Sequence, residues 1–145
     1  MATLCCDTSF LFSLYGNDAH TASAVTCVRH RRAPLTLTVL NEYELGNAFR
    51  FAEFRRLLPA GQAAQYLADF AADTAGGVLV VSVCNLAAVL TEAKRLSARY
   101  TMTEGHRSFD ILHVAAAVVL GANEFLSFDT NQKRLASAVG LKTGP

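Results

Sequence analysis

The sequence contains no tryptophan, and its formal net charge is only +1 at pH 7. It therefore lacks the general electrostatic attraction that draws strongly basic proteins to nucleic acid. Any contact with nucleic acid must come from a local arrangement of residues. Hydrophobic residues make up 52% of the chain, and many of them are alanine, which favours helices packed closely against a buried sheet.

Long hydrophobic runs and paired cysteines are also missing. The longest apolar run, 114–122, is about half as long as a bilayer span requires, so no membrane segment is predicted. The four cysteines form no C-x-x-C pair and have no metal-ligand spacing. Cys5 and Cys6 are adjacent in an apolar run, which is typical of core residues in a reducing compartment. The apolar start is interrupted by Asp7 and carries no basic leader, so we expect a cytoplasmic protein.

Short apolar runs alternate with helical patterns along the chain. The length fits one domain over residues 1–145. Strands separated by helices imply βαβ units, so the predicted fold is α/β, a three-layer α/β/α sandwich with a central parallel sheet. We expect strands at 3–6, 35–38, 78–81, 124–127 and, at an edge, 140–143. Helices are expected at 10–15, 20–32, 41–58, 59–73, 85–100, 110–120 and 130–139, with a polar loop over 101–107.

Four acidic residues stand where such a fold gathers ligands. Asp7 and Asp129 each come just past the end of a predicted strand, and Glu44 lies early in the helix after the second strand. Open parallel sheets bind ligands beyond the carboxyl ends of their strands. Asp110 begins the apolar helix before the fourth strand, with Ser108 as its expected N-cap. The strand-end rule does not place Asp110, and we expect it at the same edge.

Each of these acids has a simpler structural role when taken alone, as a helix cap or as a partner of the helix dipole. The set is what favours a site. Two carboxylates about 4 Å apart repel by roughly 4 kcal/mol at an effective dielectric near 20. Such a cluster must take up protons or bind a cation. Oxygen ligands without histidine or cysteine point to Mg²⁺ or Mn²⁺, ions that activate water in phosphodiester hydrolysis.

Four segments together resemble a PIN domain, and the likeness covers nearly the whole chain. They are Asp7-Thr-Ser after the first strand, Glu44-Leu-Gly-Asn-Ala after the second, Phe109-Asp-Ile-Leu-His-Val-Ala-Ala-Ala, and Phe125-Leu-Ser-Phe-Asp. The chain is most similar to the bacterial VapC-type toxins of toxin–antitoxin pairs.

The resemblance implies an endoribonuclease that depends on Mg²⁺ or Mn²⁺. It implies that the metal ligands, or the residues that hold the attacking water, are Asp7, Glu44, Asp110 and Asp129. Ser9 matches a small polar residue that supports the site, and Ser127 stands where the family often has threonine. The resemblance also implies an RNA substrate, a homodimer, and a cognate antitoxin that inhibits through a basic side chain in the acidic cleft.

Two residues near these acids have competing interpretations. Glu42 is a rival to Glu44, but Glu44 matches the Glu-Leu-x-Asn-Ala pattern and Glu42 falls on another helix face. His113 lies on the same helix face as Asp110, within reach of the site. We interpret it as a satisfied core histidine.

The basic residues have a plain explanation and a functional one. The cluster 29–32 ends a predicted helix, where basic side chains complement the dipole, and a role facing RNA or a partner is the alternative. Arg107, Lys133 and Arg134 lie near the acids in sequence and are candidates for phosphate contacts. Solvation at the surface is the simpler role for each of them.

Other functions on a similar sheet match less well. A phosphatase-like hydrolase usually shows Asp-x-Asp after its first strand, and Ser9 takes the second position here. A phospho-receiver domain carries paired acids at that place and a second acid after a middle strand, where this chain has Ser82. A catalytically silent PIN-fold module that binds RNA or protein is the remaining alternative, although all four acids are present.

Overall fold

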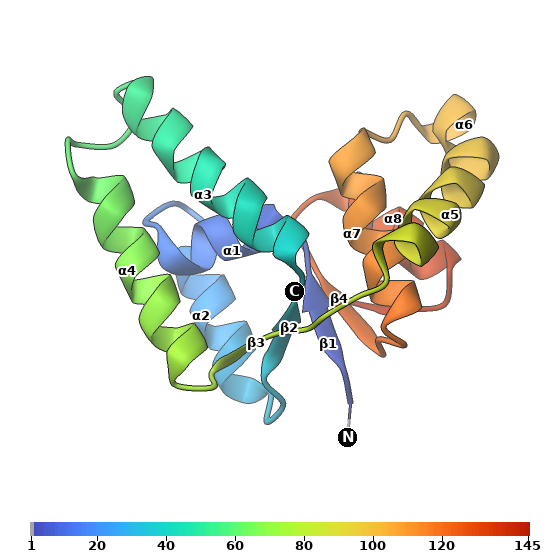
Figure 1. Ribbon diagram of the computed structural model, residues 1–145, viewed down its shortest axis with the longest axis horizontal. Coiled ribbons are helices and arrows are strands. Elements are labelled where there is room, and N and C mark those ends of the chain that lie inside the picture. The colour runs from blue at the N-terminus through green and yellow to red at the C-terminus, as the bar shows by residue number, and fades with distance from the viewer. Residues whose placement is uncertain (1) are drawn as a thin grey trace.

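A five-stranded parallel sheet forms the centre of the molecule. The computed structural model describes residues 2–145 and is shown in Figure 1. The strand order is β3-β2-β1-β4-β5, and every neighbouring pair is parallel. The strands are β1 Leu4–Cys6, β2 Leu35–Leu37, β3 Leu79–Val81, β4 Glu124–Leu126 and β5 Lys142–Gly144. This sheet confirms the predicted α/β fold, including the edge strand near the end of the chain.

Helices lie on both sides of the sheet in Figure 1. They are α1 Thr8–Tyr15, α2 Thr21–His30, α3 Val39–Phe54, α4 Gln62–Ala75, α5 Leu86–Leu96, the π-helix η1 Ser97–Thr101, α6 Met102–Glu104, α7 Ser108–Val119 and α8 Thr130–Ala138. The first four helices gather on one side, and α5 to α8 gather on the other. Within residues 2–145, no helix has the length and apolar character that crossing a membrane requires.

Alternation along the strands divides the core into two layers. Successive strand side chains point to opposite faces of a sheet. Leu4 and Cys6 therefore pack into the core beneath α1 to α4, whereas Cys5 packs into the core beneath α5, α7 and α8. Leu126 and Phe125 divide in the same way. The result is the three-layer arrangement that the sequence predicts.

Two local predictions were wrong. The segment 101–107 is not a polar loop throughout, because helical structure continues from α5 through η1 into α6 and ends at Gly105, whose φ of 72° suits glycine. The N-cap of α7 is Arg107, with an extended backbone and no capping side-chain bond, and Ser108 is the first residue of the helix.

The sheet changes winding direction at its central strand. From β1 the chain builds outward through β2 and β3, and it then returns to the other side of β1 to form β4 and β5. After β1 the chain enters α1 on one face, and after β4 it enters α8 on the other. Connections that diverge in this way leave a crevice at the carboxyl ends of the two strands.

The packing of α3 gives a test of this fold. Leu45 is fully buried in the α1–α4 core, whereas Leu57, just after α3, is 68% exposed. We expect Leu45→Ala to lower the free energy of unfolding by about 2–5 kcal/mol, because it removes buried methyl groups and leaves a cavity. Leu57→Ala should change it by less than about 0.5 kcal/mol. Urea denaturation measures both, and equal losses would contradict the described burial of Leu45.

Candidate functional site

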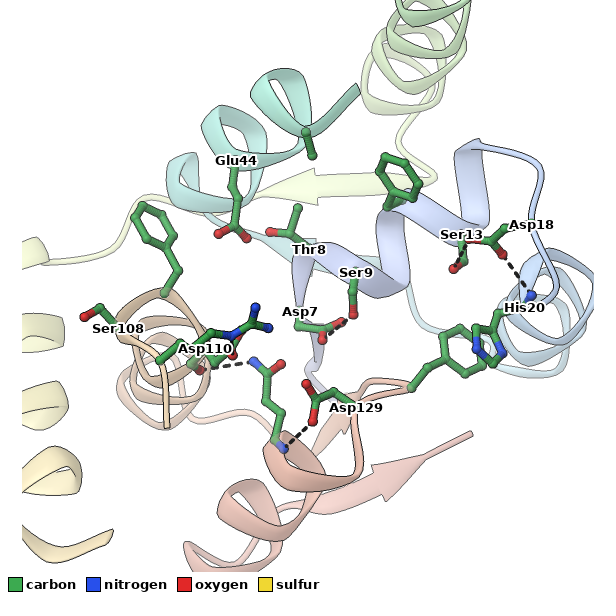
Figure 2. A pocket seen from close by; sticks show the side chains of 16 residues that line it. Asp7, Thr8, Ser9, Ser13, Asp18, His20, Glu44, Ser108, Asp110 and Asp129 are labelled. Atoms are coloured by element: carbon green, nitrogen blue, oxygen red, sulfur yellow. Dashed lines mark hydrogen bonds and ion pairs between the residues drawn. The ribbon is translucent and has the colours of Figure 1, made fainter. Parts of the chain in front are cut away.

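A cavity of about 770 Å³ opens at the carboxyl ends of β1 and β4, where the connections diverge. All four acids predicted from the sequence line it: Asp7, Glu44, Asp110 and Asp129. Figure 2 shows their side chains around one space, each from a different segment of the chain. The rival Glu42 is exposed and is not among the lining residues.

Asp7 is the most deeply placed of the four, with 2% of its surface exposed. It caps α1, since Oδ1 accepts the backbone N–H of Phe10 at 2.8 Å. Oδ2 accepts the hydroxyls of Ser9 at 2.6 Å and Ser127 at 2.8 Å. Burial nevertheless dominates and raises the pKa of Asp7 above its ordinary value, against the lowering effect of these hydrogen bonds. A cation in the cavity would relieve this cost by offsetting the buried charge.

Ser127 links Asp7 to Asp129. Its hydroxyl donates to Asp7 and also accepts the backbone N–H of Asp129 at 2.9 Å. Asp129 in turn caps α8, because its Oδ1 accepts the N–H groups of Asn131 at 2.8 Å and Gln132 at 3.1 Å. Both capping bonds fall on Oδ1, so capping is compatible with a ligand at Oδ2. Asp129 therefore caps α8, as considered from the sequence, and also lines the cavity.

Glu44 is held by a buried histidine. His113 Nε2 lies 2.9 Å from Glu44 Oε1 and 3.1 Å from Thr8 Oγ1. His113 is buried, as expected of a core histidine, and the contact to Glu44 also makes it part of the wall of the site.

Asn41 determines which nitrogen of His113 carries the proton. Its Oδ1 accepts the backbone N–H of Thr38 at 3.1 Å, so its Nδ2 must face Cys6 O and His113 Nδ1, at 3.3 Å and 3.4 Å. Since Nδ1 then accepts, Nε2 carries the hydrogen that points to Glu44. Burial alone would raise the pKa of Glu44, but hydrogen bonds from His113 and Thr8, with nearby positive charge that includes Arg107, lower it below its usual value.

Asp110 has a cation of this chain beside it. Arg107 Nε donates to Asp110 Oδ2 at 2.9 Å, and 80% of the arginine side chain is exposed. This hydrogen bond, with the charges of Asp110, Asp129 and Glu44, raises the pKa of Arg107. An exposed pair of this kind adds little stability, so the guanidinium is free to leave Asp110 at small cost.

Gln132 lines the cavity beside these acids. Its Nε2 donates to the backbone oxygen of Asp110 at 3.1 Å, which places the side chain between Asp110 and Asp129. The residue is 1% exposed, and within residues 2–145 its Oε1 is a buried acceptor without a hydrogen-bond partner. A buried unpaired acceptor is costly, which indicates that a donor such as a water molecule belongs there. The sequence pattern gave no signal for this residue.

The oxygen atoms that line the cavity suit a hard divalent cation, although their present spacing does not form a complete metal site. Carboxylate oxygens and the unpaired Gln132 Oε1 are ligands that Mg²⁺ and Mn²⁺ prefer, directly or through water. Across residues 2–145, however, no three His, Cys, Asp or Glu side chains lie close enough to hold one metal ion. Two of the four carboxylates are already paired within the chain, Asp110 with Arg107 and Glu44 with His113.

The other basic candidates lie away from the cavity. Lys133 donates to Pro145 O and Arg134 to Asn131, and neither lines the cavity. The cluster 29–32 lies at and just after the end of α2, near the amino-terminal ends of the strands. There Arg31 pairs with Glu124 at the start of β4. Arg107 alone among the predicted phosphate-binding candidates faces the acids.

The sequence matches the PIN domain family over residues 4–138, so the chain belongs to that family. Solved structures share the fold. VapC20 of Mycobacterium tuberculosis, a sarcin–ricin-loop-cleaving toxin, superposes with a TM-score of 0.70 at 18% identity and covers 96% of each chain. PAE2754 of Pyrobaculum aerophilum superposes with a TM-score of 0.64 at 19% identity, and the match covers 99% of this chain and 83% of PAE2754. FitAcB of Neisseria gonorrhoeae superposes with a TM-score of 0.64 at 15% identity, and the match covers 99% of this chain and 97% of the FitAcB chain. Among curated proteins, none matches this sequence.

The raised pKa of Asp7 predicts a pH-dependent effect of Asp7→Asn on stability. Because the folded-state pKa exceeds the unfolded value of about 3.9, the wild-type carboxyl favours folding most below that value and loses this contribution as pH rises through the folded pKa. Asparagine keeps the cap without the charge. In EDTA, the variant should therefore become increasingly more stable than wild type as pH rises toward neutrality. Urea denaturation across pH measures this difference, and a pH-independent one would refute it.

The contact between His113 and Glu44 predicts a change in acidity. Replacing His113 by leucine removes the Nε2–H donor, so the pKa of Glu44 should rise toward or above its ordinary value. Carboxyl ¹³C NMR titration of the metal-free protein reads this directly. His30→Leu is the matched control, because His30 is exposed and bonds only to Thr26 O. An unchanged Glu44 titration in His113→Leu would show that the histidine does not hold this carboxylate.

Proposed function

We propose that this chain is an endoribonuclease that hydrolyses RNA phosphodiester bonds with Mg²⁺ or Mn²⁺. The observation that carries the proposal is the convergence of four carboxylates from four segments on one cavity, with Asp7 buried at its base. A cavity with this charge attracts cations, and a bound cation offsets part of the negative charge that an anionic RNA backbone meets there.

Asp7 and Asp129 would hold the cation first, since Ser127 fixes their positions relative to each other. Asp110 would join them once Arg107 turns away, and Glu44 would hold a water molecule or a second ion. A bound divalent cation activates water and stabilises negative charge on a phosphate. Gln132 Oε1 is placed to accept a hydrogen bond from a water at the base of the cavity.

Arg107 serves as the phosphate contact in this proposal. Its guanidinium stands at the mouth of the cavity, is largely exposed, and already faces an oxyanion, Asp110 Oδ2. Exchange of that carboxylate for an RNA phosphate preserves a charge-assisted hydrogen bond. The same movement frees Asp110 for the cation, so substrate and metal binding favour each other.

The biological role we propose is that of the toxin of a toxin–antitoxin pair. Support comes from the fold shared with VapC20, a toxin that cleaves the sarcin–ricin loop. A cognate antitoxin with a basic side chain would complement the acidic cavity. Tyr43, Phe51 and Phe54 on α3 are each more than half exposed, which supports a homodimer or another protein contact. Four free thiols support a reducing cytoplasmic location.

RNA cleavage by the purified protein tests the proposal. We expect cutting with Mg²⁺ or Mn²⁺ and none in EDTA. Asp7→Asn and Asp129→Asn should each reduce the rate by roughly 100-fold or more, because even outer-shell changes at metal sites cost 10–100-fold. Asp69→Asn is the matched control, since Asp69 lies on the exposed side of α4, away from the cavity, and bonds to Gln65.

Three outcomes separate the alternatives. Cutting lost in EDTA and in both cavity variants, but kept in Asp69→Asn, supports the nuclease. Equal cutting by all proteins indicates a contaminant. RNA binding without cutting by the wild type, under any of these metal conditions, favours a catalytically silent PIN-fold binding module.

A further inference from the structure

A stack of three aromatic rings runs from the core to one wall of the cavity. Phe10 is fully buried in the α1–α4 core, Phe128 is half-buried, and His20 is exposed. The Phe128 ring is nearly parallel to both neighbours, with its centroid 5.5 Å from that of Phe10 and 4.4 Å from that of His20. Phe128 therefore stacks on one buried ring and on one exposed ring.

The outer end of this stack belongs to the same cavity as the acids. His20 and Phe128 both line it, and Phe128 immediately precedes Asp129. In Figure 2, His20 lies at the edge of the space around Asp7, Ser9 and Asp129. A ligand bound at the carboxylates therefore extends toward exposed aromatic surface on this side and toward Arg107 on the other.

The backbone that carries His20 is held in place. Asp18 Oδ1 accepts the His20 N–H at 2.8 Å, and Asp18 Oδ2 accepts the Ser13 hydroxyl at 2.9 Å. The Thr21 hydroxyl donates to Ser13 O at 2.6 Å, which ties the start of α2 to α1. The backbone at His20 is thus anchored and the exposed imidazole stacks on Phe128, so a planar ligand meets a ring that is already positioned.

We propose that the exposed His20 ring, stacked on Phe128, forms a platform for a nucleobase of single-stranded RNA whose backbone enters the carboxylate cavity. This inference rests on the proposed nuclease function and adds a base-binding subsite to it. Unstacked bases in single-stranded RNA pack on aromatic side chains, and this contact tolerates many sequences because every base has a π-face. The net charge of +1 gives little general pull on RNA, so a local contact of this kind is needed for affinity.

The test measures binding of an end-labelled, short single-stranded RNA of mixed sequence by fluorescence anisotropy. All proteins carry Asp7→Asn, so that the RNA stays intact during the measurement. His20→Ala should weaken binding by roughly 5- to 100-fold, the range found when one base–aromatic stack is removed. His20→Phe keeps a ring and should retain affinity, whereas His20→Asn keeps only a polar group and should behave like alanine. His30→Ala is the matched control, an exposed histidine at the far end of α2.

The pattern across these variants decides the matter. Loss in His20→Ala and His20→Asn, with affinity kept in His20→Phe and His30→Ala, supports the platform. Equal binding by all variants overturns it. The platform is also overturned if His20→Asn retains RNA affinity and His20→Phe loses it, because that result would indicate a hydrogen bond from residue 20 rather than stacking. Absence of RNA binding by the parent protein also overturns it. Cleavage is measured separately on proteins with Asp7 intact: if the ring-dependent binding holds but wild type does not cut, the nuclease proposal fails and the platform stands.

Discussion

The burial of the Asp7 carboxylate is the constraint on which the site depends. Asp7 directly follows the central strand and is 2% exposed, and it accepts three hydrogen bonds from two segments: from Ser9 and the Phe10 N–H in α1, and from Ser127 after β4. These bonds fix the start of α1 against the end of β4. They do not fully offset the cost of burying the charge, since the pKa of Asp7 remains raised. In our proposal a divalent cation would provide the missing compensation, and this is the physical reason for placing the metal at Asp7.

The other acids differ in how they are held before any cation arrives. Glu44 is oriented by His113, whose tautomer follows from Asn41. Asp110 is paired with the exposed Arg107. The protein therefore compensates part of the negative charge of its acidic cavity with its own side chains. In our proposal, RNA takes Arg107 from Asp110, and the cation then takes its place beside that carboxylate.

The fold, and the convergence of the four acids on one cavity, could be predicted from the sequence mainly because buried strands and strand ends have a local pattern. Buried strands appear as short apolar runs, and residues that follow parallel strands meet at one edge of the sheet, as Asp7 and Asp129 do. Predicting the position of Asp110 required the topology as well. A helix that leads into the parallel strand β4 must begin at the edge where the strands end. The pairing of His113 with Asn41 and Glu44, and the unpaired Gln132, depend on contacts between residues far apart in the chain. Periodicity does not record such contacts. The continuation of α5 into η1 and α6 depended on where a glycine stops the helix.

The most direct test of the account is a crystal structure of the protein with Mn²⁺, in which anomalous scattering locates the ion. The account predicts an ion between Asp7 and Asp129, with Arg107 displaced from Asp110 and a bound water at Gln132 Oε1. An ion elsewhere, or no ion at saturating Mn²⁺ with Arg107 still on Asp110, would contradict the metal site on which the proposed function rests.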